Sequence, residues 1–317
     1  MKSAFTALCA GAVLLAAAAA GAQGLPGWKG YPAGYVFPVG DGPYPAVMET
    51  EPSLATHTVY HPKALDRFGA AEKLPIVAFG NGGCANVGSM YRDFLTEIAS
   101  QGMLVIAVGP VGADLRALPA PNMPPPQPGA PPPKLPPVAT QSSQLIDAIN
   151  WAVAENGRAG GKYHGKLDIK AIAVMGQSCG GVQALEVSTD PRVKTTVVLN
   201  SGLFSEKSPI PGLDVPESHL ARLHAPVAYF IGGSKDVAFP NAEHNYPLLK
   251  VPVFKANMEV GHMATYAQPN GGAFGKVAAD WLRWRLKGDR AAGARFTGSG
   301  CGLCKDPAWK VERKGIG

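Results

Sequence analysis

The chain carries little charge and no concentrated block of it. Asp, Glu, Lys and Arg make up 16% of its 317 residues, and the formal net charge is +6. The sequence contains no run of Lys and Arg, and no stretch in which basic and aromatic residues alternate. Those patterns are typical of nucleic-acid-binding surfaces. We therefore expect no nucleic-acid partner.

Long hydrophobic runs are equally scarce, and the one that occurs lies near the first residue. Lys2 is followed by an almost wholly apolar stretch over residues 4–20 and by the small residues Ala20, Gly21 and Ala22. This order is typical of a secretory signal peptide. We predict a signal peptide over residues 1–22, cleavage after Ala22, and a secreted or periplasmic protein. An uncleaved membrane anchor is the alternative, which the short run and its small-residue end disfavour.

Beyond residue 22, no apolar run is long enough to span a bilayer, so we expect the mature chain to lack a membrane span. The 295 residues that remain (317 minus 22) suit a single domain over residues 23–317, and we expect a monomer. Loss of Lys2 lowers the formal charge from +6 to +5, which leaves a mildly basic surface.

Clusters of metal-ligating residues are also missing. His57 and His61 could share one face of a strand, but no group of Cys or carboxylate residues accompanies them. We expect neither a metal nor an organic cofactor.

The chain does contain a regular alternation of short apolar runs and helical patterns. This alternation predicts an α/β fold with a mainly parallel sheet that helices cover on both faces. The predicted strands are 56–59, 75–79, 103–108, 172–175, 195–199, 227–231 and 251–254, and the predicted helices are 91–100, 141–156, 182–188 and 276–286.

Two segments depart from this alternation. Residues 119–137 are rich in proline, which supplies no backbone N–H to a helix or a sheet. We predict a surface insertion with an extended, polyproline-like backbone. Residues 291–317 form a tail with a Cys-x-x-Cys pair, and we expect the tail to pack back onto the domain.

The most informative motif is Gly176-Gln177-Ser178-Cys179-Gly180, which fits the G-x-S-x-G nucleophile elbow. An apolar strand pattern precedes it and a helical pattern follows it. A sharp strand-to-helix turn would hold the serine in a strained backbone conformation, and the flanking glycines would avoid collisions with the neighbouring strand and helix. The motif predicts Ser178 as a catalytic nucleophile.

A serine nucleophile needs a base, and the base needs an acid that fixes its tautomer. Asp236 follows the predicted strand 227–231, and His262 follows the predicted strand 251–254. The order nucleophile, acid, base and the placement at strand ends both match the elbow. Asp236 and His262 are therefore the predicted acid and base, and His224 and His244 are weaker candidates for the base. The alternatives are a turn-capping role for Asp236 and a structural role for His262.

Acyl transfer also needs N–H donors that stabilise an oxyanion. The N–H of the residue after the nucleophile, Cys179, is one candidate. The glycine-rich segment that follows the predicted strand 75–79 supplies the other, with Cys84 as first choice and Gly83 as second. A purely structural turn would also explain these glycines.

Taken together, Asn81-Gly82-Gly83-Cys84, the elbow, Gly232-Gly233-Ser234-Lys235-Asp236 and Gly261-His262 resemble the secreted serine α/β-hydrolases. The resemblance covers roughly residues 73–288 and is nearest to the dienelactone-hydrolase-like proteins, chlorophyllases and cutinase-like polyester hydrolases. It implies an α/β-hydrolase fold and hydrolysis of carboxylic esters through an acyl-enzyme, and it places Cys84 at the first oxyanion position. Dienelactone hydrolases proper use a cysteine nucleophile, and polyester hydrolases lack a long proline insertion, so polymer activity does not follow.

Four cysteines remain after the predicted cleavage, and an even number in an exported chain suggests two disulfides with three connectivities. Cys84 and Cys179 would both flank the oxyanion hole. We therefore predict a Cys84–Cys179 disulfide, with Cys301–Cys304 as the second pair. Two buried free thiols are the alternative for the first pair, and a redox role is the weaker alternative for the second.

The leading hypothesis is a carboxylic ester hydrolase that acts on a small-molecule or polymeric ester. Acyl transfer or peptide cleavage by the same residues is one alternative, and a non-catalytic binding protein is another. The predicted substrate contacts are residues beside the catalytic segments, which core packing explains equally well. They are Tyr91, Leu203, Phe204, Met263 and Tyr266.

Overall fold

The computed structural model describes residues 34–115 and 137–316. The predicted signal peptide (1–22) and all of the predicted proline-rich insertion except its last residue lie outside the described residues. Among the described residues, no helix is long and apolar enough to cross a membrane.

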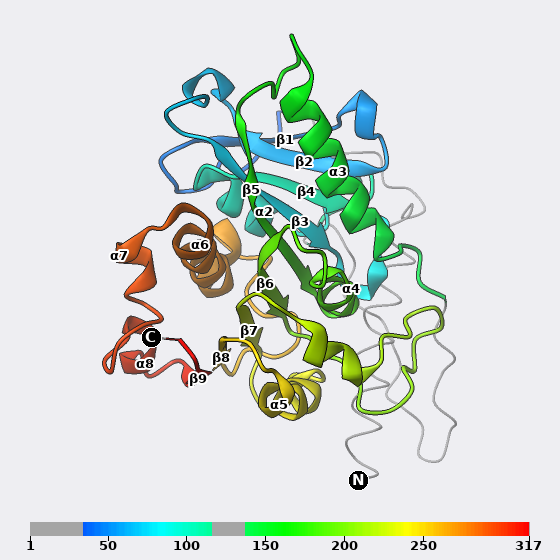
Figure 1. Cartoon of the computed structure of the whole chain (residues 1–317), viewed down its shortest axis with the longest axis vertical. Coiled ribbons are helices and arrows are strands. Elements are labelled where there is room, and N and C mark those ends of the chain that lie inside the picture. Colours follow the sequence, from blue (N-terminus) through cyan, green and yellow to red (C-terminus); the bar gives the residue numbers. More distant parts are fainter. Residues whose placement is uncertain (1–33, 116–136, 317) are drawn as a thin grey trace.

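The described chain forms an α/β fold around one nine-stranded sheet, with strand order β1-β2-β4-β3-β5-β6-β7-β8-β9 (Figure 1). The strands from β4 to β8 in this order run parallel, whereas β1, β2 and β9 pair antiparallel at the two edges. The predicted α/β class with a mainly parallel sheet is confirmed. The strands are β1 (Ala46–Glu49), β2 (His57–Pro62), β3 (Leu74–Gly80), β4 (Leu104–Val108), β5 (Leu167–Gln177), β6 (Val193–Leu199), β7 (Val227–Ile231), β8 (Val253–Asn257) and β9 (Lys310–Lys314).

Helices cover both faces of the sheet, as the strand sequences require. In β3, alternate residues face opposite sides: Val77 and Phe79 pack into one apolar core, and Ile76 and Ala78 pack into another. A strand buried on both faces reads as a continuous apolar run, which is why these strands were visible in the sequence. The helices are α2 (Arg92–Ser100), α3 (Ser143–Gly157), α4 (Cys179–Val187), α5 (Phe239–Leu248), α6 (Gly272–Lys287), α7 (Arg290–Gly293) and α8 (Gly302–Lys305).

The two helical layers have different partners in the core. Residues of α2 and α6 share a core with one face of the sheet, whereas residues of α3, α4 and α5 pack on the opposite face. Figure 1 shows α6 on one side of the sheet and α3 and α4 on the other. Because β3, β5, β6, β7 and β8 are parallel, their carboxyl ends meet at one edge of the sheet, where loops can bring distant residues together.

The tail packs back onto the domain, as predicted. Strand β9 pairs with β8 and forms one edge of the sheet, and the ring of Phe296 stacks on that of Trp284 in α6. Trp309 is buried against Phe230 and Phe274. The Cys301–Cys304 disulfide lies within this tail, where it encloses the short helix α8.

Several element boundaries differ from the predictions. The helix predicted to start at Val182 begins at Cys179, directly after the serine, because glycines at a helix start weaken the helical pattern in the sequence. The strand predicted from 251 begins at Val253, after Pro252. Strands β1 and β9 and helix α5, which contains Pro247, were not predicted.

Candidate active site

Ser178 lies in the tight turn between β5 and α4. Its φ of 52° and ψ of −119° are a strained combination for a residue with a side chain. A Cβ on Gly176 would lie 2.1 Å from the carbonyl oxygen of Gly180, and a Cβ on Gly180 would lie 2.1 Å from the backbone of Gly80 at the end of β3. The glycines on either side of Ser178 are therefore needed for close contact with the helix and the neighbouring strand, as the motif predicted.

Three side chains from separate strand ends form one hydrogen-bonded chain. The Nε2 atom of His262 lies 3.0 Å from the Oγ of Ser178, and its Nδ1 lies 2.6 Å from an Oδ1 oxygen of Asp236. Since the carboxylate accepts a hydrogen bond from the Nδ1–H group, the Nε2 atom of the neutral ring is left as an acceptor for the serine hydroxyl. The structure thus brings together the three residues predicted from the sequence.

Asp236 is buried and accepts four hydrogen bonds. Besides His262, its Oδ1 accepts the N–H of Ala238 at 2.9 Å, and its Oδ2 accepts the N–H of Gly232 at 2.9 Å and the amide of Asn200 at 2.6 Å. Burial alone would raise the pKa of Asp236, but the hydrogen bond and charge of His262 and the backbone donors together hold it below the ordinary value. The carboxyl therefore stays ionised at neutral pH.

Two buried amide side chains, those of Asn200 and Gln177, hydrogen-bond to Asp236 and to the backbone of His262. Asn200 bonds Asp236 on one side and accepts the hydroxyl of Tyr266 on the other. Gln177, just before the serine, donates to the carbonyl of His262 at 3.1 Å and accepts the hydroxyl of Tyr91 at 2.7 Å. The sequence pattern did not indicate these roles. The position of Asn200, directly after β6, is the only signal that could have suggested one.

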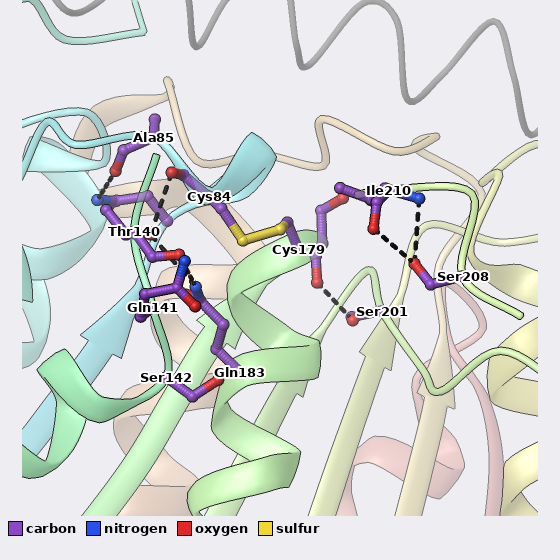
Figure 2. Close-up of a disulfide and its surroundings, with 12 residues drawn as sticks. Cys84, Ala85, Thr140, Gln141, Ser142, Cys179, Gln183, Ser201, Ser208 and Ile210 are labelled. Carbon is purple, nitrogen blue, oxygen red and sulfur yellow. Dashed lines mark hydrogen bonds between the residues drawn. A yellow bond between two sulfur atoms is a disulfide. The ribbon is translucent and has the colours of Figure 1, made fainter. Parts of the chain in front are cut away.

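On the other side of Ser178, a disulfide joins Cys84 to Cys179 with a Cα–Cα distance of 5.2 Å. Figure 2 shows it connecting the turn after β3 to the start of α4. The N–H of Gly180 also donates to the carbonyl of Asn81 at 3.0 Å, so the two segments are linked by a hydrogen bond as well. The predicted pairing of all four described cysteines is present in the structure.

The two linked segments carry the predicted oxyanion donors. Cys179 is the first residue of α4, and its N–H has no acceptor within the described part of the chain. Gly83 and Cys84 form the short 3-10 turn η3 (Gly82–Cys84) with φ values of 62° and 48°. The N–H of Cys84 donates a 3.2 Å bond to Asn81, whereas the N–H of Gly83 has no acceptor among the described residues.

The disulfide is further supported from the segment before α3. The hydroxyl of Thr140 donates to the carbonyl of Cys84 at 3.0 Å, and the amide of Gln183 donates to the carbonyl of Thr140 at 2.8 Å (Figure 2). Since Gln183 lies on α4, these hydrogen bonds through Thr140 connect the same two segments that the disulfide joins. The backbone of Cys84 is thereby fixed on both sides.

A cavity opens beside Ser178 and encloses about 430 Å³, including the part open to solvent. Apart from His262, the described residues that line it carry no ionisable side chain, and most of these side chains are apolar. It lies at the carboxyl ends of β6 and β7. Its lining residues are Ser178, Cys179, Val182, Asn200, Ser201, Gly202, Phe204, Pro209, Ile210, Val237, Ala238, Asn241 and His262.

Of the five predicted substrate contacts, only Phe204 lines this cavity. Tyr91, Leu203 and Tyr266 are buried in the core, so their prediction as substrate contacts was wrong. These residues were predicted because they lie next to site residues in the sequence. Residues beside a site residue often point into the sheet instead. Met263 is 43% exposed beside His262 but does not line the cavity.

The four histidines that the sequence analysis weighed for other roles have structural partners. The Nε2 of His57 lies 2.9 Å from the carbonyl of Gln144, and His61 contacts Glu49 and the carbonyl of Pro62. His224 lies near the carbonyl of Val193, and His244 contacts Glu217. Within residues 34–115 and 137–316, no group of three or more His, Cys, Asp or Glu side chains could hold a metal ion.

No family model matches this chain, and no curated protein is significantly similar to it. The chemistry of the site is therefore the basis for a functional assignment.

Proposed function

We propose that this protein is a serine hydrolase of the α/β-hydrolase fold that cleaves carboxylic esters through an acyl-enzyme intermediate. The observation that carries the proposal is the hydrogen-bonded chain from Ser178 through His262 to Asp236, with the serine on a strained strand-to-helix turn. A hydroxyl, an imidazole and a buried carboxylate in this order are the arrangement that activates a serine.

In the first half of the reaction, Nε2 of His262 takes the proton of Ser178 as Oγ attacks the ester carbonyl. The negative charge on the carbonyl oxygen is stabilised by the N–H groups of Cys179 and Gly83, which have no acceptor among the described residues, whereas the N–H of Cys84, the first choice from the sequence, already donates to Asn81. The protonated imidazole, held by Asp236, then gives its proton to the leaving alcohol, and the acyl group stays on Ser178.

In the second half, His262 takes a proton from water as the water oxygen attacks the acyl carbonyl. The same N–H groups stabilise the second oxyanion, and the proton returns to Ser178 as the carboxylic acid leaves. Because the imidazole must be neutral to accept a proton, activity should fall toward acid pH.

The cavity beside Ser178 favours an ester substrate with an uncharged, apolar group on one side of the ester bond. A buried carboxylate or phosphate would need a cationic partner. In the described part of the chain, no Lys or Arg lines the cavity. Apolar side chains such as Phe204, Ile210 and Val237 would instead contact an alkyl or aryl group.

Export of the chain is part of the proposal. Two disulfides, one of them at the active site, fit an oxidising compartment such as the periplasm or the extracellular space. Signal-peptide cleavage after Ala22 remains a prediction, which N-terminal sequencing of the exported protein would test.

The proposal is tested by assaying the wild-type protein and the Ser178→Ala variant against aryl, feruloyl, short-chain, lipid and polyester substrates. We expect hydrolysis of at least one uncharged ester, and loss of that activity by about 10⁴-fold or more in Ser178→Ala. Unchanged hydrolysis in Ser178→Ala would reject the mechanism. No hydrolysis of any ester, with transfer or binding activity instead, would favour one of the alternative functions.

A further inference from the structure

Among the described residues, Asn200 is the one whose side-chain amide donates to Asp236. It follows β6 directly, is fully buried, and adopts a φ of 45°, which is uncommon for a residue other than glycine. Its Nδ2 donates to the Oδ2 of Asp236 at 2.6 Å and makes a longer contact of 3.3 Å with the carbonyl of Gly261. The amide therefore connects the acid with the loop that carries His262.

The orientation of this amide is fixed by Tyr266. The Tyr266 hydroxyl donates to the Oδ1 of Asn200. Burial, together with the neighbouring Tyr91 and the Asp236 carboxylate, raises the pKa of Tyr266 well above its ordinary value, so the hydroxyl remains a donor at neutral pH. With Oδ1 occupied, Nδ2 must face Asp236, and a flipped amide would place two acceptors against each other.

The base has a similar support. Gln177 donates to the carbonyl of His262, and the Tyr91 hydroxyl occupies the Oε1 of Gln177. The rings of Tyr91 and Tyr266 pack edge to face, with centroids 5.3 Å apart. The two tyrosine–amide pairs thus share one buried layer beneath the catalytic chain.

We propose that Asn200, oriented by Tyr266, is a positioning residue that holds the Asp236 carboxylate at the angle at which its Oδ1 faces the imidazole of His262. This inference rests on the proposed function. Among the described residues, the Oδ2 oxygen has two donors, the backbone N–H of Gly232 and the amide of Asn200. Loss of the amide would leave Oδ2 with the Gly232 N–H alone, so the carboxylate would be held less firmly on the side away from His262.

Orientation matters most when His262 is protonated. The Nδ1–H bond to Asp236 then becomes charge-assisted, and it is strongest when the carboxylate oxygen lies in line with the N–H. Asp236 is buried. Weakening this support should slow the chemical step without changing how the substrate binds.

The test compares three variants of the full-length protein. Tyr266→Phe removes only the hydroxyl that orients Asn200. Asn200→Gly removes the amide and tolerates the positive φ. Tyr229→Phe is the matched control, because the Tyr229 hydroxyl is also buried but has no hydrogen-bond partner among the described residues. Each variant is assayed for kcat, KM and thermal midpoint.

We expect Tyr266→Phe to lower kcat by about tenfold. Asn200→Gly should lower it by about 100-fold. KM should change little in both, and Tyr229→Phe should match the wild type. A second readout is independent of turnover: the NMR resonance of the proton between His262 and Asp236 should shift or broaden in Tyr266→Phe and Asn200→Gly, and stay in place in Tyr229→Phe.

The positioning role is wrong if Tyr266→Phe keeps both the wild-type kcat and the wild-type proton resonance. It is also wrong if kcat falls only together with a raised KM and a lowered thermal midpoint, because that pattern reports a general loss of structure. Loss of the proposed function has a different signature, which is ester hydrolysis that survives in Ser178→Ala. If no ester is hydrolysed at all, the proton resonance alone decides the positioning role.

Discussion

The two sides of Ser178 are held by different kinds of bond. On the oxyanion side, a covalent disulfide joins the backbone segments of Cys84 and Cys179. On the acid–base side, Asp236 and His262 are held only by hydrogen bonds, several of them from buried amides. The first side supplies backbone N–H groups, and the second supplies side chains that change protonation during turnover.

This difference follows from what each side must do in the proposed reaction. Backbone donors around an oxyanion need a fixed position and no change in charge, so a covalent link serves them well. An imidazole that gains and loses a proton needs partners that tolerate both states, and an ionised carboxylate with several donors does so. Substitutions on the two sides should therefore change kcat and the free energy of unfolding to different extents.

The largest effect should come from the acid. Asp236→Asn keeps the shape but removes the charge and favours the wrong tautomer of His262, so we expect kcat to fall by about 10⁴-fold. Steady-state kinetics at pH 7 measures this change. The exposed Asp66→Asn variant serves as the control and should match the wild type. A loss of less than about tenfold would mean that the acid side does not depend on Asp236.

The oxyanion side should respond less in rate and more in stability. In the double variant Cys84→Ala/Cys179→Ala we expect kcat to fall by about 10-fold to 100-fold as the N–H donors lose their fixed positions. The two cysteines are 95 residues apart in the sequence, so the free energy of unfolding should fall by up to about 4.7 kcal/mol. Denaturant titration and ester kinetics measure the two effects.

The second disulfide provides the control for that experiment. Cys301 and Cys304 are separated by 3 residues and lie in the tail, so the double variant Cys301→Ala/Cys304→Ala should lose no more than about 1.6 kcal/mol and keep its activity. Equal losses of activity in the two double variants would contradict a specific role for the disulfide beside Ser178.

The hydrogen-bonded arrangement of Ser178, His262 and Asp236 was predictable because its signals are local. The elbow needs glycines at fixed offsets, and both Asp236 and His262 follow apolar runs that read as buried strands. The parallel sheet was predictable for the same reason, since strands buried on both faces are continuously apolar. The Cys84–Cys179 pair became predictable once both residues were placed beside the same oxyanion.

The supporting residues were not predictable from the same signals. Tyr91 and Tyr266 were predicted to contact substrate, but they lie beneath the site and orient Gln177 and Asn200. Which face a side chain takes near a strand end depends on tertiary packing rather than on its neighbours in sequence. The cavity residues Ile210 and Val237 were missed because they lie in loops without periodicity.

A smaller effect should appear on the cavity side. Phe204→Ala removes the largest apolar side chain that lines the cavity, so we expect kcat/KM for an apolar aryl or alkyl ester to fall by about tenfold, mainly through KM. The exposed Met263→Ala variant, beside His262 but outside the cavity lining, should change it by less than about twofold. A larger fall of kcat/KM in Met263→Ala than in Phe204→Ala would place the substrate on the other side of His262.

The smallest effect concerns stability alone. Burial lowers the pKa of His57. As the pH falls below about 6.5, this histidine takes up a proton in the unfolded chain but stays neutral in the folded protein. Its contribution to stability is present above the unfolded pKa of about 6.5 and is lost as pH falls through the lower folded pKa. Denaturant titrations at pH 7 and pH 5 should show this loss in the wild type and a smaller loss in His57→Gln. An equal loss in both would exclude His57 as a cause.

The most direct test of the central claim is covalent labelling of the nucleophile. A fluorophosphonate probe reacts with a serine that a neighbouring base activates, and mass spectrometry of the digested protein locates the modified residue. We predict labelling of the wild-type protein at Ser178 only, with no labelling of Ser178→Ala. Absence of labelling in the folded wild-type protein, or labelling that persists in Ser178→Ala, would contradict the proposed catalytic serine.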